Sequence, residues 1–253
     1  MKVNSLQAII LAAGMGSRLG DYTKNIPKAM ITVHDKPLLF YTLDYLAQNN
    51  ISEVIIVVGY LKNLIINSVG YRFKNMKITY VENDIYYDTN NIYSLYLTKD
   101  KVNDDVLLLE CDLYYKKDII DLMVNSCGDC NILVSPYNSK NMNGSVVKID
   151  KNNNVKELIV KKNQYDDFDY SDVFKTVNIY KFSKDFFLRK YIPIMDYYIK
   201  NYSKNSYYEL VLGALIYFSN DNFKAIVIDE SNWKEIDDEK DFEIAKKEYY
   251  KWY

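Results

Sequence analysis

Short apolar runs and helix-like segments alternate along the first half of this chain, and this alternation constrains the fold more than any other feature. Apolar runs typical of strands lie at residues 7–11, 54–58, 78–81, 106–110 and 131–135. Helical patterns lie between them, at residues 38–48, 61–69, 91–99 and 117–125. Strands that alternate with helices in this way predict an α/β fold with a doubly wound, mostly parallel sheet.

The second half of the chain has a different pattern. Residues 145–149 and 155–160 flank the polar residues 150–154, and together they predict a β-hairpin. A strand at 176–182, helices at 184–201 and 207–218, and a last helix at 238–250 follow. We therefore expect a mixed sheet in which a β/α portion is added to the parallel part.

Composition limits the class of protein. The chain has 253 residues, of which 49% are hydrophobic and 26% charged, so it can bury a substantial core as one domain. Its net charge of -2 argues against a general nucleic-acid binder, which needs a basic surface. Residues 6–13 are too short for a membrane span and lack the basic leader of a signal peptide. We expect a cytoplasmic protein with no nucleic-acid or membrane partner.

A glycine-containing loop follows the first predicted strand. Its sequence is Leu11-Ala12-Ala13-Gly14-Met15-Gly16-Ser17-Arg18. Gly14 and Gly16 can adopt positive φ, which lets several backbone N–H groups approach an anionic ligand. Arg18 can clamp two phosphate oxygens, while Lys28 adds a point charge on a third. This pattern predicts a loop that holds a triphosphate.

Two other phosphate-binding loops fit this sequence less well. A Walker loop needs Lys-Ser/Thr directly after its last glycine, where this chain has Ser17 and Arg18. The dinucleotide fingerprint needs a third glycine at the position of Leu19, which makes an NAD-dependent oxidoreductase an unfavoured alternative. A glycine turn that merely joins a strand to a helix is the remaining alternative for the glycines alone.

With these residues the chain resembles the nucleotidyltransferase superfamily that includes the sugar-1-phosphate nucleotidyltransferases and the phosphocholine cytidylyltransferases. The resemblance rests on residues 12–19, 23 and 27–30 and continues through 58–60, 83–84, 90–95, 109–112 and 233–238. It implies a single Rossmann-like, GT-A-like domain over residues 1–253. We expect a nucleotide-binding half at 1–140 and an acceptor-binding half with the C-terminal helix at 141–253. One departure is the lack of a proline, present in many members, at Asp21 or Tyr22.

The resemblance assigns catalysis to Arg18, Lys28, Asp112 and Asp237. Asp112 follows a predicted strand, so its carboxylate is expected at the same sheet edge as the loop. Mg²⁺ is usually held by one or two carboxylates together with substrate phosphates, and the resemblance puts it on Asp112 and Asp237. Asp238 is left as the N-cap of the last helix.

The nucleotide is predicted from residues 83–97. This segment resembles the phosphocholine and aminoethylphosphonate cytidylyltransferases rather than the sugar enzymes, which favours CTP. Asn83, Asn91 and Ser94 could meet the cytosine edge beside loop residues 11–18. The alternative is that Asn90 or Asn91 caps a helix, which would explain the presence of asparagine at these two positions equally well.

The second half resembles enzymes that activate aminoethylphosphonate or phosphoglutamine. The residues expected at the acceptor are Tyr137, Lys161, Lys162, Asn178 and Glu209. A lysine of the pair would meet the acceptor phosphate, and Glu209, with Tyr137 or Tyr207 nearby, would meet an ammonium group. The alternative is that the lysines end a solvated strand and that Glu209 is an exposed helix residue.

These expectations predict CMP transfer from MgCTP to the phosphate or phosphonate of a small amine-bearing acceptor, with release of pyrophosphate. The nucleophile is an oxygen of the acceptor's phosphate or phosphonate, which is already anionic at pH 7. Catalysis therefore needs alignment and charge neutralisation rather than a general base. We expect a monomer or homodimer that serves cell-surface polysaccharide or capsule modification. A sugar-1-phosphate nucleotidyltransferase and a binding module without turnover are the alternatives.

Overall fold

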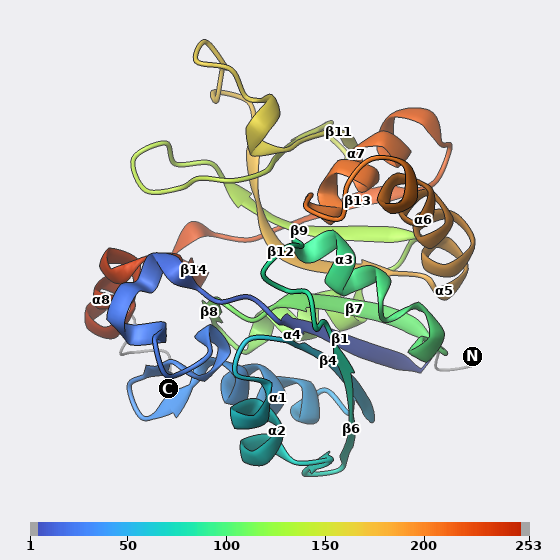
Figure 1. Ribbon diagram of the computed structural model, residues 1–253. Coiled ribbons are helices and arrows are strands. Elements are labelled where there is room, and N and C mark those ends of the chain that lie inside the picture. The colour runs from blue at the N-terminus through green and yellow to red at the C-terminus, as the bar shows by residue number, and fades with distance from the viewer. Residues whose placement is uncertain (1–4, 249–253) are drawn as a thin grey trace.

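The computed structural model describes residues 5–248, and within this range ten strands form one mixed sheet. Its main path has the order β11-β10-β12-β7-β1-β4-β6-β5, and β9 pairs with both β12 and β13 (Figure 1). The bounds are β1 Leu6–Ala12, β4 Glu53–Val58, β5 Arg72–Phe73, β6 Met76–Glu82, β7 Asp105–Glu110, β9 Cys130–Pro136, β10 Val146–Ile149, β11 Val155–Ile159, β12 Phe174–Phe182 and β13 Phe223–Val227. The predicted fold class is confirmed.

The parallel centre of the sheet consists of β7, β1, β4 and β6. β1 pairs in parallel with β4 and β7, and Leu11 lies opposite both Val57 and Glu110. After β1 the chain continues to β4 and β6 on one side of β1, and then returns to β7 on the other side. Such a switch point in an open α/β sheet opens a crevice outside the carboxyl ends of the strands.

Two hydrophobic cores cover the two faces of the sheet. Alternate residues of β1 point to opposite faces, so Ile10 lies in one core and Ile9 in the other. The first core contains α1 Leu38–Gln48, α2 Lys62–Val69, α4 Asp118–Asn125 and α8 Glu239–Glu248. The second contains α3 Asn91–Tyr96, α5 Lys184–Phe186, α6 Ile192–Asn201 and α7 Tyr208–Phe218 (Figure 1). Strands buried on both faces explain the continuous apolar runs in the sequence.

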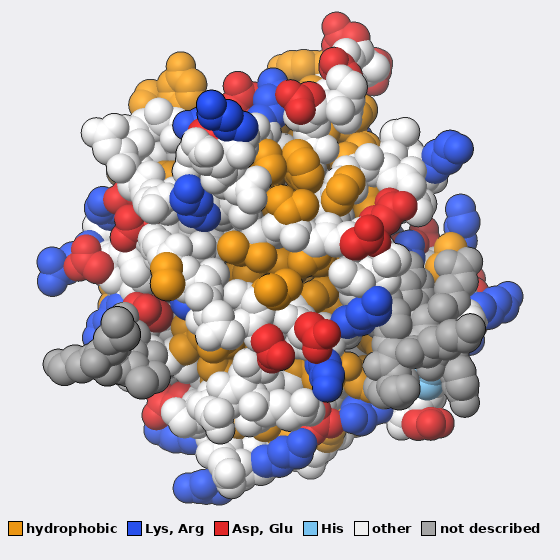
Figure 2. Space-filling view, turned by 180° about the vertical axis from the view of Figure 1, so that it is seen from behind, with side chains coloured by type: hydrophobic (Ala, Val, Ile, Leu, Met, Phe, Trp, Pro, Cys, Tyr) orange, Lys and Arg blue, Asp and Glu red, His pale blue; other side chains and the backbone are white. Residues whose placement is uncertain are grey.

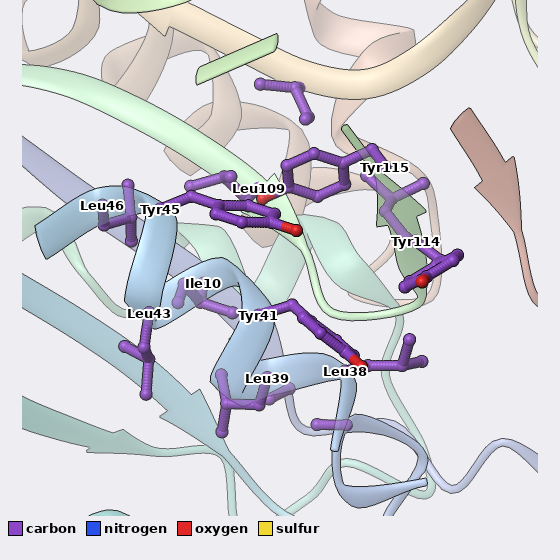
Figure 3. Close-up of a cluster of buried hydrophobic side chains, with 14 of the residues drawn as sticks. Ile10, Leu38, Leu39, Tyr41, Leu43, Tyr45, Leu46, Leu109, Tyr114 and Tyr115 are labelled. Atoms are coloured by element: carbon purple, nitrogen blue, oxygen red, sulfur yellow. The ribbon is translucent and has the colours of Figure 1, made fainter. Parts of the chain in front are cut away.

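An aromatic part of the first core supports a short strand, β8 Leu113–Tyr115 (Figure 3). The Tyr114 and Tyr115 rings lie 5.4 and 5.7 Å from those of Tyr41 and Tyr45 of α1, and the Tyr115 hydroxyl donates to Thr42 Oγ1 at 3.1 Å. β8 pairs with β14 Trp233–Glu235, while β2 Thr32–Val33 and β3 Lys36–Pro37 form a separate small hairpin. The packing of β8 fixes the chain immediately after residue 112.

Most predicted elements are present. Five strands were not predicted from the sequence: the short strands β2, β3, β5 and β8, and β13, which pairs with β9. The helix predicted at 91–99 ends at Tyr96, and Thr98 Oγ1 donates to the Leu95 carbonyl at 2.7 Å before a 3₁₀ turn. A π-helical turn, Phe187–Tyr191, interrupts the helix predicted at 184–201. The predicted end of the last helix, residues 249–250, lies outside the described residues.

The face seen in Figure 2 carries positive and negative side chains interspersed around hydrophobic ones, so its described part presents no field of one sign. None of the helices within residues 5–248 has the length and apolar character needed to cross a membrane.

Candidate active site

A cavity of about 550 Å³ lies outside the carboxyl ends of β1 and β7. It brings together most residues that the sequence singled out: Leu11, Ala13, Gly14, Met15, Gly16, Ser17, Arg18, Lys28, Asn83, Asn91, Ser94, Asp112, Lys161, Asn178, Glu209 and Asp237. Ala12, Tyr137 and Lys162 do not line it. The cavity therefore joins loop residues from the N-terminal half with side chains from the C-terminal half.

The glycine-containing loop presents its backbone to this cavity. Gly16 has φ +63°, and a Cβ there would lie 2.9 Å from Lys28 Cβ, so a larger residue would be both strained and crowded. A Cβ on Gly14 would meet nothing within 4 Å, so a ligand can approach the backbone there. Within residues 5–248, the N–H groups of Gly14, Met15 and Gly16 donate no hydrogen bond. They are free to bind anionic oxygens.

Two cations and two carboxylates meet beside the loop. Lys28 Nζ lies 2.8 Å from Asp112 Oδ2 and 3.0 Å from Asp237 Oδ1. Arg18 reaches the same Asp237 oxygen at 2.8 Å. The antiparallel pair β8–β14 brings the two aspartates together, because Ile236 N donates to the Asp112 carbonyl at 2.9 Å. The four residues expected to carry catalysis thus form one cluster.

A third carboxylate, Glu235, belongs to this cluster and was missed in the sequence. Single ligand atoms of Asp112, Glu235 and Asp237 all lie within 4.8 Å of one another. Strand periodicity is the signal that could have found Glu235, because it ends β14 two positions before Asp237, and side chains two positions apart in an extended segment share a face. Asp238 instead caps α8, since its Oδ1 accepts from Asp241 N at 2.9 Å.

These carboxylates fit a divalent cation. Asp112 Oδ1 is buried and has no hydrogen-bond partner among the described residues, so an acceptor oxygen is left free toward the cluster. Hard cations such as Mg²⁺ and Ca²⁺ take oxygen ligands of this kind. Asp112, Glu235 and Asp237 are the residues that could hold one.

Neighbouring charges set the protonation of the cluster. Burial opposes the charged form of Lys28, but Asp112 and Asp237 outweigh it and hold the pKa of the lysine above its usual value. Burial also opposes the charged form of Asp237, whose pKa is nevertheless lowered by Lys28 and Arg18. Burial raises the pKa of Glu235 to about 7, although Lys175 opposes this shift. Lys28 and Asp237 are therefore charged at neutral pH.

The side chains expected at the nucleotide base have different surroundings. Asn83 is buried, and its Nδ2 donates to Thr89 Oγ1 and Ser94 Oγ at 2.9 and 3.1 Å. Asn90 caps α3, because its Oδ1 accepts from the next backbone N–H at 2.8 Å. Asn91 Nδ2 donates to Glu110 Oε1 at 3.1 Å. Its Oδ1 accepts from the first backbone N–H of α7 at 3.1 Å, so Asn91 joins α3 to α7.

Glu209 lies on the cavity wall and is only 5% exposed, so the alternative that it is an exposed helix residue is wrong. Its Oε1 accepts from the Tyr180 hydroxyl at 2.9 Å and from Thr176 Oγ1 at 3.3 Å. Its Oε2 has no hydrogen-bond partner within residues 5–248. Of the two tyrosines expected nearby, Tyr207 lines the cavity, whereas Tyr137 stacks on Tyr170 outside it.

Lys175, a buried cation of the cavity, was also missed in the sequence. Its side chain is 2% exposed, and its Nζ lies 3.3 Å from Glu235 Oε2. Asn178 Nδ2 donates to the other Glu235 oxygen at 2.9 Å. Because Lys175 and Asn178 both belong to β12, this strand holds both oxygens of Glu235.

Lys161 also lines the cavity, and its Nζ reaches the Tyr170 hydroxyl at 3.2 Å.

A ligand cavity at the switch point of a parallel sheet is typical of nucleotide-binding α/β proteins, and this structure is of that class. The chain belongs to the family of MobA-like NTP transferase domains, whose model matches residues 8–162.

Cytidylyltransferases are among its relatives. The chain is 27% identical, over 92% of its length, to CMP-5'-(3-aminopropyl)phosphonate synthase of Streptomyces rubellomurinus, of which the match covers 37%. It is 40% identical, over 45% of its length, to 48% of the choline-phosphate cytidylyltransferase of Streptococcus pneumoniae. It is 29% identical, over 94% of its length, to 98% of the CTP:phosphoglutamine cytidylyltransferase of Campylobacter jejuni. The match thus spans less than half of the first two proteins.

The fold is also similar to that of solved structures. One is the CTP:phosphocholine cytidylyltransferase of Streptococcus pneumoniae, with a TM-score of 0.77 at 24% identity, covering 96% of this chain and 98% of that chain. The inositol-1-phosphate CTP transferase of T. maritima gives a TM-score of 0.73 at 20% identity, covering 95% of both chains.

Proposed function

We propose that the chain transfers CMP from MgCTP to the phosphate or phosphonate oxygen of a small amine-bearing acceptor and releases pyrophosphate. The observation that carries this proposal is the single cavity that joins the free N–H groups of the loop, the Lys28 cluster and the buried carboxylate of Glu209. The activities for which these relatives are named favour CTP as the nucleotide and an aminophosphonate, phosphocholine or phosphoglutamine as the acceptor.

The residues of the loop hold and neutralise the triphosphate. Gly14, Met15 and Gly16 donate backbone N–H groups, and the Arg18 guanidinium binds the outer phosphates. Lys28 stabilises the charge that develops on the α-phosphate during in-line attack. The attacking oxygen is already anionic, so no side chain has to remove a proton from it.

The metal site of this proposal is the carboxylate cluster. Asp112 and Asp237 would hold Mg²⁺, with Glu235 as the third carboxylate within reach. Mg²⁺, when bound, supplies positive charge that neutralises phosphate oxygens and orients the reactants. Because Lys28 bridges the two aspartates, it keeps them close together before substrates bind.

The acceptor is proposed to lie between Glu209 and the carboxylate cluster. Glu209 Oε2 offers an unpaired oxygen to an ammonium group, and the Tyr207 ring lies on the same cavity wall. Lys161 is the cavity lysine available to the acceptor anion, whereas Lys162 lies outside the cavity. Asn83, Asn91 and Ser94 remain the residues proposed near cytosine. We further propose a cytoplasmic monomer or homodimer whose product serves cell-surface polysaccharide or capsule modification.

Pyrophosphate release tests this function directly. The assay pairs the Mg²⁺ salts of CTP, UTP, GTP, ATP and dTTP with 2-aminoethylphosphonate, phosphocholine, phosphoglutamine and glucose 1-phosphate. We expect the highest kcat/KM for CTP with an amine-bearing acceptor, and no release in EDTA. A higher kcat/KM for glucose 1-phosphate than for every amine-bearing acceptor would contradict the proposal and indicate a sugar-1-phosphate nucleotidyltransferase.

A further inference from the structure

One residue outside the cavity, Tyr60, connects the two ends of the phosphate loop. Tyr60 lies two positions after the end of β4. Its N–H donates to the Ala13 carbonyl at 3.0 Å, near the start of the loop. Its hydroxyl shares a proton between the carbonyls of Thr23 and Lys24, at 3.1 and 2.8 Å, just after the loop. The loop is therefore closed by a residue that does not itself line the cavity.

The backbone beside Tyr60 is built for this contact. A Cβ on Gly59 would lie 2.8 Å from the Ala13 carbonyl oxygen and 2.9 Å from Tyr86 Cβ. Both distances are too short for any larger residue without movement of the backbone. The end of β4 can approach the start of the loop only because this position is glycine.

A second set of bonds joins the residues after the loop to Gly16 inside it. Thr23 Oγ1 donates to the Gly16 carbonyl at 2.9 Å, and Leu19 N donates to the same oxygen at 3.0 Å. The Ala13 and Gly16 carbonyls thus accept from protein donors, whereas the N–H groups of Gly14, Met15 and Gly16 donate to none of the residues 5–248. Tyr60 holds Thr23, and Thr23 holds the turn at Gly16.

We infer that Tyr60 is a positioning residue that preorganises the loop for the phosphates of a nucleoside triphosphate. The identity of the ligand in this inference rests on the proposed function. The hydrogen bonds by which Tyr60 fixes the loop do not depend on it. Fixing the loop in its binding conformation before the ligand arrives lowers the entropic cost of binding. Loss of the hydroxyl should therefore weaken phosphate binding without removing any group that touches the ligand.

The test variant is Tyr60→Phe, which keeps the ring and removes the bonds to residues 23 and 24. Tyr80→Phe is a matched control, because the Tyr80 hydroxyl also donates to one backbone carbonyl, that of Gly70 at 2.6 Å, away from the loop. Amide hydrogen exchange on the ligand-free protein reports loop opening directly. Calorimetric titration with MgCTP and with inorganic tripolyphosphate reports phosphate binding.

We expect faster exchange at the hydrogen-bonded amides within residues 19–24 in Tyr60→Phe only. Its Kd for MgCTP and for tripolyphosphate should rise by the same factor, about 3- to 10-fold, the range for one lost neutral hydrogen bond. KM for CTP should rise in parallel, with kcat changed by less than about 2-fold, since the contact acts equally in ground and transition states.

Unchanged exchange in the loop, or the same changes in Tyr80→Phe, would overturn the inference. So would a fall in kcat at constant Kd, which would place Tyr60 in the chemical step. If the unaltered protein bound neither MgCTP nor tripolyphosphate, the proposed function would fail, and the exchange comparison would still decide whether Tyr60 clamps the loop.

Discussion

Lys28 and Asp112, which are 84 positions apart in the chain, form an ion pair of 2.8 Å at the edge of the central sheet. Lys28 follows the phosphate loop, and Asp112 precedes β8, which packs on the tyrosines of α1. The aromatic core that fixes β8 therefore also fixes the distance between the phosphate loop and the carboxylate cluster.

Replacement of Lys28 tests the electrostatic part of the mechanism. We expect Lys28→Ala to lower kcat about 10²- to 10³-fold, or about 2.7–4 kcal/mol, as for other preorganised donors to developing charge. Lys36→Ala is the matched control, because Lys36 also pairs with an aspartate, Asp44 at 2.6 Å, but outside the cavity. Near-normal kcat in Lys28→Ala, measured by pyrophosphate release, would reject the role of this lysine.

The proposed metal site predicts opposite results for Asp112, a metal ligand, and Asp238, which caps α8. Asp112→Asn should abolish turnover and weaken Mn²⁺ binding while the circular dichroism spectrum stays unchanged, because the change keeps shape but removes charge. Asp238→Asn should cost little, since asparagine caps a helix about as well as aspartate. Full activity in the first variant, or none in the second, would show that the carboxylates were assigned wrongly.

Glu209 is predicted to recognise the positive charge of the acceptor. Glu209→Gln keeps an oxygen that can accept from Tyr180 but loses the charge, so the fold should be maintained. We expect KM for the acceptor to rise by the equivalent of about 1–3 kcal/mol, with little change in KM for CTP. Glu157→Gln, at an exposed position of β11, is the control. Equal increases in both KM values would indicate a structural role for α7.

Asp150 gives a pH-dependent contribution to stability. Side-chain and backbone donors of Asn154, with the backbone N–H of Asn152, hold the pKa of Asp150 below its usual value. The folded protein therefore binds fewer protons than the unfolded chain around pH 4. The stabilisation is fully present above the unfolded pKa and is lost progressively as the pH falls from there toward the lower pKa of the folded state.

Thermal unfolding between pH 3 and 7 measures this contribution. Asp150→Ala should lower Tm at pH 7 and differ less from the unaltered protein at pH 3. Asp166→Ala, an exposed aspartate, serves as the control. A Tm difference that stays constant over this pH range would contradict the role of the Asp150 charge.

The sequence alone determined the parallel centre of the fold and the nature of the loop. Both depend on local chemistry: strands buried on both faces have continuous apolar runs, and a loop that binds phosphate through its backbone needs residues such as Gly16. Asp112 was predictable from the topology of a parallel sheet, because it follows a strand whose carboxyl end had to lie beside that loop.

Only the tertiary structure decided which other side chains reach the cavity. Glu235 joins the carboxylates because β14 pairs with β8, a strand about 120 positions earlier, and the buried Lys175 of β12 reaches Glu235 at 3.3 Å. Glu209 faces inward, whereas Tyr137 stacks on Tyr170 outside the cavity. Residue type limits what a side chain can bind, but its direction and burial depend on the register and packing of distant segments.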